Sequence, residues 1–449
     1  MRAILNDYLK RGLLWIIAVL LPLSPLHGAD SISYYGVTLH FSVDSIVGKF
    51  ADGEPWIVGP VSVTGIDKPS IPLDSKFTGG AMINPIPGGL QGFCPRNSDP
   101  TLVHRYDASL DVSLKYPFTL AAGDSLIVAR TTEPPNDTAN MIESIIGFTV
   151  LASAPPEGSF RPGLYGKDRR IRFNVSDIDW SILKNLPRVA ATPTQAWIEA
   201  DARLPALPWW DWAGEWGVTR LRPFANCGAG DGGGFRSNYG REIAFKWSYV
   251  ALWLNCDFPQ AVKQKTMVQT IQAGIDLGSY FDNGGVIGAS GGHQVGFKFP
   301  MFLAAAALKD PGLVTYASAQ NRFIEDVTTF YVQPTDVGRV VESGTSAAYL
   351  QEDVGIADWG ILHAWNPAKD DRRWRDGVPY RFAQWPAMTG QVFAAELMGL
   401  KESWGHPAIF AYNERFVSKE GLGNGFEGQM WDRYKLGRPT APQGLKKKR

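Results

Sequence analysis

Three short groups of polar and aromatic residues precede predicted helices in the second half of the chain. They lie at residues 237–242 (SNYGRE), 291–298 (GGHQVGFK) and 376–385 (DGVPYRFAQW), and each contains glycine. Glycine lets the backbone approach a ligand closely, and the N-terminus of a helix favours an anion. Each group also has a structural interpretation, either as a capped helix start or as a loop packed by aromatic rings. We expect these groups to line a cleft that binds an acidic ligand.

Tyrosine, histidine and arginine together provide what β-elimination on a uronic acid polymer requires. A cation or amide must neutralise the substrate carboxylate, a base must remove the proton from the adjacent carbon, and an acid must protonate the leaving glycosidic oxygen. We predict catalytic roles for His293, Tyr239 and Tyr380. We predict that the substrate is bound by Asn238, Arg241, Gln294, Lys298, Arg381, Trp209 and Trp210. No metal and no cofactor is expected, since these side chains can neutralise the carboxylate themselves.

Two other functions remain open. A glycoside hydrolase needs two carboxyl groups that face each other across a cleft, about 5–10 Å apart. The candidates for such a pair are Glu352, Asp353, Asp231 and Glu215. A non-catalytic carbohydrate-binding protein would instead stack sugar rings on Trp209, Trp210, Trp212 and Trp216.

The composition is that of a folded protein with an excess of tryptophan. Of the 449 residues, 45% are hydrophobic and 20% are charged, which excludes a disordered chain. The 44 Lys and Arg residues balance the 44 Asp and Glu residues, so no overall field attracts nucleic acid. The 16 tryptophans exceed what a core requires. We expect sugar-stacking surfaces in residues 209–216 and 359–385, and core positions for Trp247 and Trp253 in the helices.

The first 29 residues have the features of a secretory signal peptide. Basic residues precede an apolar run at 12–23 that is too short to span a bilayer comfortably, and Gly28 and Ala29 follow it. An uncleaved anchor is the alternative. We therefore expect a periplasmic or secreted protein without a membrane segment after cleavage, whose partner is an acidic polysaccharide and not nucleic acid.

Three cysteines are an odd number for an exported chain. The spacing of Cys94, Cys227 and Cys256 does not resemble a zinc site. Either Cys227 pairs with Cys256, or Cys256 is a small buried apolar residue in a helix.

The spacing of apolar residues changes near residue 238. Between 30 and 154, short β-rich runs alternate with turn signals, which predicts an antiparallel, β-sandwich-like domain. Residues 155–237 are rich in Pro, Trp and Gly, and we expect them to form connecting and cleft loops. From 238 to 436 the spacing is helical and predicts hairpins that form an incomplete α/α toroid. Residues 437–449 form a basic tail.

Local pattern also predicts two individual elements within these regions. Residues 108–114 alternate like a strand, and residues 356–365 have a helical spacing of apolar side chains.

The helical half resembles a known group of secreted bacterial enzymes. The stretches NYGREIAFKWSYVALWLNCDFP, IQAGIDLGSYFDNGG and GGHQVGFKFPMFLAAAAL resemble a family in which an Asn/Asp-Tyr-Gly-Arg helix start precedes a Gly-Gly-His-Gly-x-Gly-Arg-Lys-type turn. This pattern is similar to that of α/α-toroid polysaccharide lyases of the alginate and glucuronan type. The resemblance covers most of the chain after the leader. It implies active-site roles for Tyr239, Arg241, His293 and Lys298.

The chain departs from the family pattern at two positions of the glycine-rich turn. Gln294 and Phe297 stand where the pattern has glycine and arginine. The missing arginine removes one possible contact to a substrate carboxylate.

Overall fold

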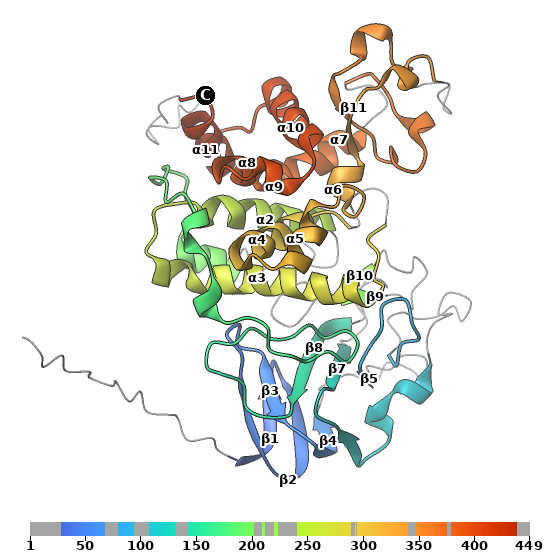
Figure 1. The fold of residues 1–449 in the computed structure, drawn as a ribbon, viewed down its shortest axis with the longest axis vertical. Coiled ribbons are helices and arrows are strands. Elements are labelled where there is room, and N and C mark those ends of the chain that lie inside the picture. The colour runs from blue at the N-terminus through green and yellow to red at the C-terminus, as the bar shows by residue number, and fades with distance from the viewer. Residues whose placement is uncertain are drawn as a thin grey trace, which may run out of the picture.

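The computed structural model describes most of the chain after the predicted leader. The described residues are 28–67, 80–93, 107–131, 142–201, 209–211, 220–222, 240–288, 292, 294–339, 347–374 and 379–437. Figure 1 shows a β-sheet at one end of the molecule, two layers of helices stacked on it, and a small lobe beside the outer layer. Gly28 and Ala29, the last two residues of the predicted leader, begin the first strand.

The N-terminal part forms one eight-stranded sheet. Its strands are β1 (Gly28–Tyr34), β2 (Val37–Lys49), β3 (Pro55–Val58), β4 (Val61–Asp67), β5 (Ala81–Ile83), β6 (Phe118–Leu120), β7 (Ser125–Thr131) and β8 (Ile142–Leu151). They follow the order β5-β7-β8-β3-β2-β4-β6, with β1 paired to β2, and the sheet curls into a nearly closed, barrel-like form. Apolar residues that alternate along β2, among them Val37 and Leu39, are buried in its core.

The predicted antiparallel sandwich is wrong. Strands β3 and β8 pair in parallel, with Trp56 opposite Thr149 and Val58 opposite Leu151, so the sheet is mixed. This pairing joins the β2–β4 strands to the β5–β7–β8 strands edge to edge. The two groups therefore share one hydrogen-bonded sheet and do not pack face to face as two.

The predicted strand at 108–114 is also wrong. Residues Ala108–Leu110 and Val112–Leu114 form two 3₁₀ turns, capped by Asp107 and Asp111. Asp111 is buried, and its Oδ1 accepts hydrogen bonds from the backbone N–H of Ala81 and of Ser113, both at 2.9 Å. Aspartate side chains that bond nearby backbone compete with strand pairing, which explains the difference.

The second half of the chain is helical. Its helices are α2 (Gly240–Leu254), α3 (Gln260–Asp282), α4 (Lys298–Leu308), α5 (Pro311–Ser318), α6 (Ile324–Val327), α7 (Pro379–Gln384), α8 (Thr389–Leu397), α9 (Lys401–Trp404), α10 (Pro407–Glu420) and α11 (Phe426–Tyr434). Figure 1 shows α2 to α5 as the layer next to the sheet and α8 to α11 as the layer above. Trp247 and Trp253 of α2 are buried, as predicted, and so are Trp359 and Trp385, which the sequence places in a sugar-stacking region.

The predicted toroid is wrong. Polar contacts pack α2 directly against α8, because Gln391 Nε2 donates to the Ala244 carbonyl at 2.8 Å. Nearby, Ser248 Oγ donates to the Ala387 carbonyl at 2.7 Å. The helices also differ widely in length, from 4 residues in α9 to 23 in α3. Helices of such unequal length stack as layers here and do not close into a ring of equal hairpins.

The segment 356–365 contains a strand and not the predicted helix. Strand β12 (Ala357–Trp359) pairs antiparallel with β11 (Thr329–Tyr331) in the lobe beside the outer helical layer. Asp358, in the middle of β12, is buried against Arg381, a residue from another element. Tertiary pairing has overridden the local helical spacing.

Cys256 is a free, buried thiol just after α2, so the alternative of a small buried residue is confirmed and that of a Cys227–Cys256 disulfide is not, although the residue lies outside the helix. Burial raises the pKa of the Cys256 thiol to about 12, and its Sγ donates to the Leu252 carbonyl. Cys94 and Cys227 lie outside the described residues. Among the helices that the structure describes, none is both long enough and apolar enough to cross a bilayer.

A buried arginine joins the sheet to the helical half. Arg161 pairs with Glu54, which lies beside β3, and its Nη2 donates to Asp276 Oδ2 of α3 at 2.6 Å. Its backbone also exchanges two 3.0 Å hydrogen bonds with the Gln272 amide of α3. Burial raises the pKa of Glu54, of Asp276 and of the neighbouring Asp52, while the Arg161 charge lowers all three. This guanidinium thus holds several buried carboxyl groups at the junction.

We predict that Arg161→Met weakens the fold in a pH-dependent way. The substitution leaves Glu54 and Asp276 buried without their cation, so the free energy of unfolding should fall by about 3–5 kcal/mol at about pH 8. In the variant the carboxyl pKa values of the folded state lie still further above those of the unfolded state. Its stability therefore falls as pH rises, and the deficit should be smaller at about pH 5. Chemical denaturation followed by tryptophan fluorescence measures both values.

Arg170→Met is the matched control. Arg170 is 76% exposed and pairs with Asp168, so its loss should leave the stability nearly unchanged. An Arg161→Met deficit that is equal at both pH values would contradict the assignment.

Candidate functional site

The start of α2 lies against the glycine-rich turn before α4. The backbone N–H of Arg241 donates to the Gly292 carbonyl at 2.8 Å. Gly296, with φ +95°, packs on the same helix, because a Cβ at this position would lie 2.7 Å from the Ala244 Cα. Only glycine fits both this backbone conformation and this contact. Two of the three predicted groups therefore meet in the structure.

The side chain of Arg241 reaches the third group. Its guanidinium pairs with Glu242 through Nε, at 2.8 Å, and through Nη2, while Nη1 is 3.5 Å from the Ala383 carbonyl of α7. The Arg241 side chain is 34% exposed, whereas that of Glu242 is 6% exposed. Tyr380, on the same short helix α7, is 40% exposed. A partly exposed guanidinium and a partly exposed tyrosine therefore lie on neighbouring elements.

Gln294 and Lys298 lie inside the protein, beneath the turn. Both are 0% exposed. Gln294 Oε1 accepts the backbone N–H of Gly288 at 2.9 Å, and Lys298 Nζ donates to Asp326 Oδ2 at 2.5 Å. The Lys298 ammonium also lies over the rings of Phe323 and Trp404. In this conformation both side chains support the turn and do not reach the surface.

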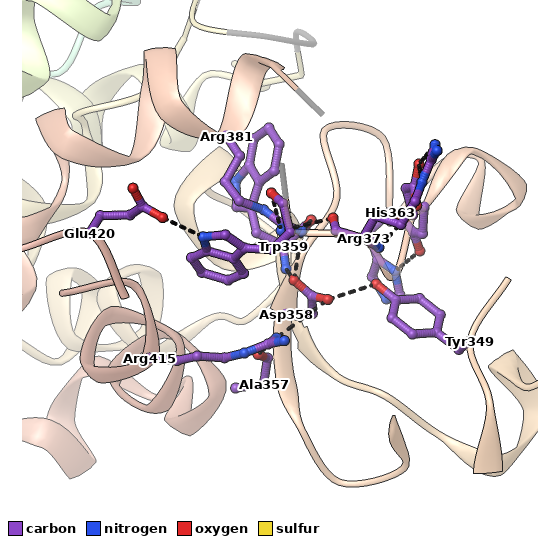
Figure 2. A network of polar contacts seen from close by, with 12 residues as sticks. Tyr349, Ala357, Asp358, Trp359, His363, Arg373, Arg381, Arg415 and Glu420 are labelled. Carbon is purple, nitrogen blue, oxygen red and sulfur yellow. Dashed lines mark hydrogen bonds and ion pairs between the residues drawn. The ribbon is translucent and has the colours of Figure 1, made fainter. Parts of the chain in front are cut away.

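Asp358 of the lobe is the centre of a buried network that includes Arg381 of α7. Arg381 Nη2 donates to Asp358 Oδ1 at 2.7 Å, and Asp358 Oδ2 accepts from the Tyr349 hydroxyl at 3.1 Å. Arg415 approaches the same carboxylate at 3.4 Å and donates to the Ala357 carbonyl at 2.7 Å. Figure 2 shows Asp358 of β12 with Arg381 of α7, Arg415 of α10 and Tyr349 of the lobe around it. Arg381 and Asp358 are fully buried, so this pair fastens α7 to the lobe.

A histidine–aspartate pair lies in the same lobe. His363 Nδ1 is 2.7 Å from Asp370 Oδ2, and its ring stacks on Phe330 with the centroids 3.5 Å apart. The His363 side chain is 24% exposed and the Asp370 side chain 4%. The carboxylate and the ring stack together orient the imidazole.

Several predicted residues lie outside the described part of the chain. These are His293, Tyr239 and Asn238, together with Asp231, Glu215, Trp212 and Trp216. Trp209 and Trp210 belong to strand β9 (Trp209–Asp211), which pairs with β10 (Arg220–Arg222). Their roles stay predictions.

Of the four carboxylates proposed for a hydrolase, the structure describes two, Glu352 and Asp353, and these do not face each other. Glu352 and Asp353 are adjacent on one 3₁₀ turn, and both pair with Arg372 at 3.0 Å. Two neighbours that share one cation do not frame a cleft in the way that acid and base carboxyls require. Within the described ranges, no group of three or more His, Cys, Asp or Glu side chains has the arrangement of a metal site.

Glu325 and Asp326 are residues of the site that the sequence did not single out. Both belong to the short helix α6 and are buried. Glu325 Oε1 accepts the backbone N–H groups of Gly296 and Lys298. A signal was present, because two consecutive acidic residues between apolar ones must find partners if that segment is buried. The sequence could not identify those partners.

Comparison with known proteins found no relative: no protein-family model, no curated protein and no solved structure matches this chain. The resemblance to polysaccharide lyases therefore stays a prediction.

We predict that Asp358→Ala destabilises the protein by about 3–5 kcal/mol, because it leaves the buried Arg381 guanidinium without its carboxylate. Equilibrium unfolding by a chemical denaturant measures this loss. Glu352→Ala removes a carboxylate that is 72% exposed and should leave the stability almost unchanged. Equal effects in the two variants would show that the Asp358 network does not hold α7 to the lobe.

Proposed function

We propose that this chain is a polysaccharide lyase that cleaves a uronic-acid-containing polymer by β-elimination. The observation that carries the proposal is the hydrogen bond from Arg241 N–H to the Gly292 carbonyl. Tyr239 precedes Arg241 by two positions and His293 follows Gly292 directly. The bond thus supports a common location for the two groups that contain the proposed acid and base. The contact between Arg241 and α7 supports adding Tyr380 to them.

The proposed reaction uses one base, one acid and one neutralising group. His293 removes the proton from the carbon beside the substrate carboxylate. The electron pair of that bond forms a carbon–carbon double bond as the bond to the glycosidic oxygen breaks, and Tyr239 or Tyr380 protonates the leaving oxygen. Arg241, with Asn238, neutralises the carboxylate and so stabilises the charge that develops when the proton leaves.

The buried residues take supporting roles in this proposal. Gln294, Lys298 and Arg381 hold the turn and α7 in place, since none of them has exposed surface. Trp209 and Trp210 of β9 are the proposed stacking surface for sugar rings. The signal peptide predicted from the sequence suits a polymer found outside the cell, and we propose a periplasmic or secreted location.

We predict that the protein releases unsaturated products from alginate, glucuronan or a related uronate polymer. The double bond absorbs ultraviolet light, so a rise in absorbance reports the reaction. His293→Ala and Tyr239→Phe should each reduce kcat by about a hundredfold or more, because each removes a proton-transfer group. Tyr380→Phe decides which tyrosine is the acid.

Matched variants control for general effects of losing a ring. His40→Ala on β2 removes a half-exposed imidazole that pairs with Asp67, and Tyr331→Phe on β11 removes an exposed hydroxyl. Both should retain full activity. New reducing ends without absorbance would instead indicate a hydrolase. Glycan binding that survives His293→Ala and Tyr239→Phe, with no turnover, would indicate a non-catalytic binding protein.

A further inference from the structure

The glycine-rich turn is held from behind by one carboxylate. Glu325 Oε1 accepts the backbone N–H of Gly296 at 2.8 Å and that of Lys298 at 2.9 Å. The carboxylate is 1% exposed, and both hydrogen bonds are buried. One oxygen atom therefore ties together the end of the turn and the first residue of α4.

A second contact from α6 reinforces the first. Asp326 pairs with Lys298 Nζ through Oδ2, while its Oδ1 accepts the Trp404 indole N–H at 2.9 Å. Glu325 thus binds the main chain at Lys298, and Asp326 binds its side chain. The Asp326 charge, next to Glu325 on α6, also raises the pKa of Glu325, whereas Lys298 of α4 acts on it through its backbone N–H.

The far side of the turn rests on α2. Gly296 has no room for a side chain beside Ala244, and the Gly292 carbonyl accepts the Arg241 N–H. Any shift of Gly296 away from Glu325 therefore changes the contact between the turn and the start of α2. These are the elements that the proposed function assigns to His293 and Tyr239.

We propose that Glu325 is a positioning residue of the proposed active site, which sets the conformation of the turn beside His293 through Gly296 and Lys298. The expected effect of Glu325 on catalysis rests on the proposed function. Its effect on the backbone of the turn rests on the two hydrogen bonds alone. Glu325 touches no substrate in this role. It acts by holding the backbone, so a neutral oxygen acceptor of the same shape can replace it.

The protonation of Glu325 offers a readout that a merely structural contact would not have. Glu325 Oε2 is buried and has no hydrogen-bond partner among the described residues, and burial raises the pKa of the carboxyl from 4.5 to about 7. The hydrogen bonds from Gly296 and Lys298 lower this pKa, so a turn that opens while Glu325 stays buried binds a proton more readily than the closed turn. Closing therefore becomes more favourable as pH rises through about 7.

The test is amide hydrogen exchange at Gly296 and Lys298 in the full-length protein, corrected for the intrinsic pH dependence of exchange. In the wild type, protection should rise by about threefold or more between pH 5 and pH 8, as Glu325 loses its proton. Glu325→Ala should lose this protection and lower kcat on the uronate polymer with little change in KM. Glu325→Gln, which keeps Oε1, should restore protection and activity and abolish the pH dependence.

Glu427→Ala is the control for the loss of a buried carboxyl elsewhere. Glu427 lies on α11, and burial raises its pKa to about 8, as burial also raises the pKa of Glu325. It should not change exchange at Gly296 or Lys298. Unchanged protection in Glu325→Ala, or a pH dependence that persists in Glu325→Gln, overturns the inference even if the enzyme is active. If the exchange pattern is as expected but the protein cleaves no uronate polymer, the proposed function is overturned. The role of Glu325 in holding the backbone of Gly296 and Lys298 is then still supported.

Discussion

Buried cations that pair with carboxylates from other segments hold this molecule together. Arg161 joins the sheet to α3 through Glu54 and Asp276, Lys298 joins α4 to α6 through Asp326, and Arg381 joins α7 to the lobe through Asp358. A buried charge without its partner costs several kcal/mol, so each pair commits two elements to one arrangement. The placement of the sheet against α3, of α4 against α6 and of α7 against the lobe depends on this constraint.

The same constraint decides which charged side chains remain accessible at the surface. Lys298 and Arg381 are used inside the protein, whereas the Arg241 side chain keeps about a third of its surface exposed beside the turn and α7. The neutral overall charge is thus compatible with an acidic ligand, since one partly exposed guanidinium in the right place is sufficient to meet a carboxylate. Gly296 of the glycine-rich turn is hydrogen-bonded by Glu325 of α6 on one side and packs against α2 on the other. Such support is what a catalytic group needs in order to be held in a productive geometry.

Much of the secondary structure could be predicted, because local spacing reports burial. The helical spacing between 238 and 436 led to helices in that range, and the short β-rich runs between 30 and 154 led to strands. Prediction failed where side chains compete with local pattern. Asp107 and Asp111 cap 3₁₀ turns in a segment that alternates like a strand. Asp358 lies in a strand within a segment of helical spacing, and it pairs there with Arg381. Tryptophan content was likewise a poor guide, since Trp359 and Trp385 are core residues.

Local residue patterns predicted most element types along the chain and the kinds of chemistry available at three glycine-containing groups. Long-range contacts set the rest: the strands form one mixed sheet, the helices stack in layers, and the three groups meet at Arg241. Long-range contacts also explain the role of Glu325 and Asp326, two acidic residues that the sequence did not single out. Both bind Lys298 and so hold the glycine-rich turn in place. The physical reason is that strand register and buried ion pairs join residues far apart in the chain. The energy of each such pairing depends on a residue distant in sequence, and the local residue pattern does not identify that residue.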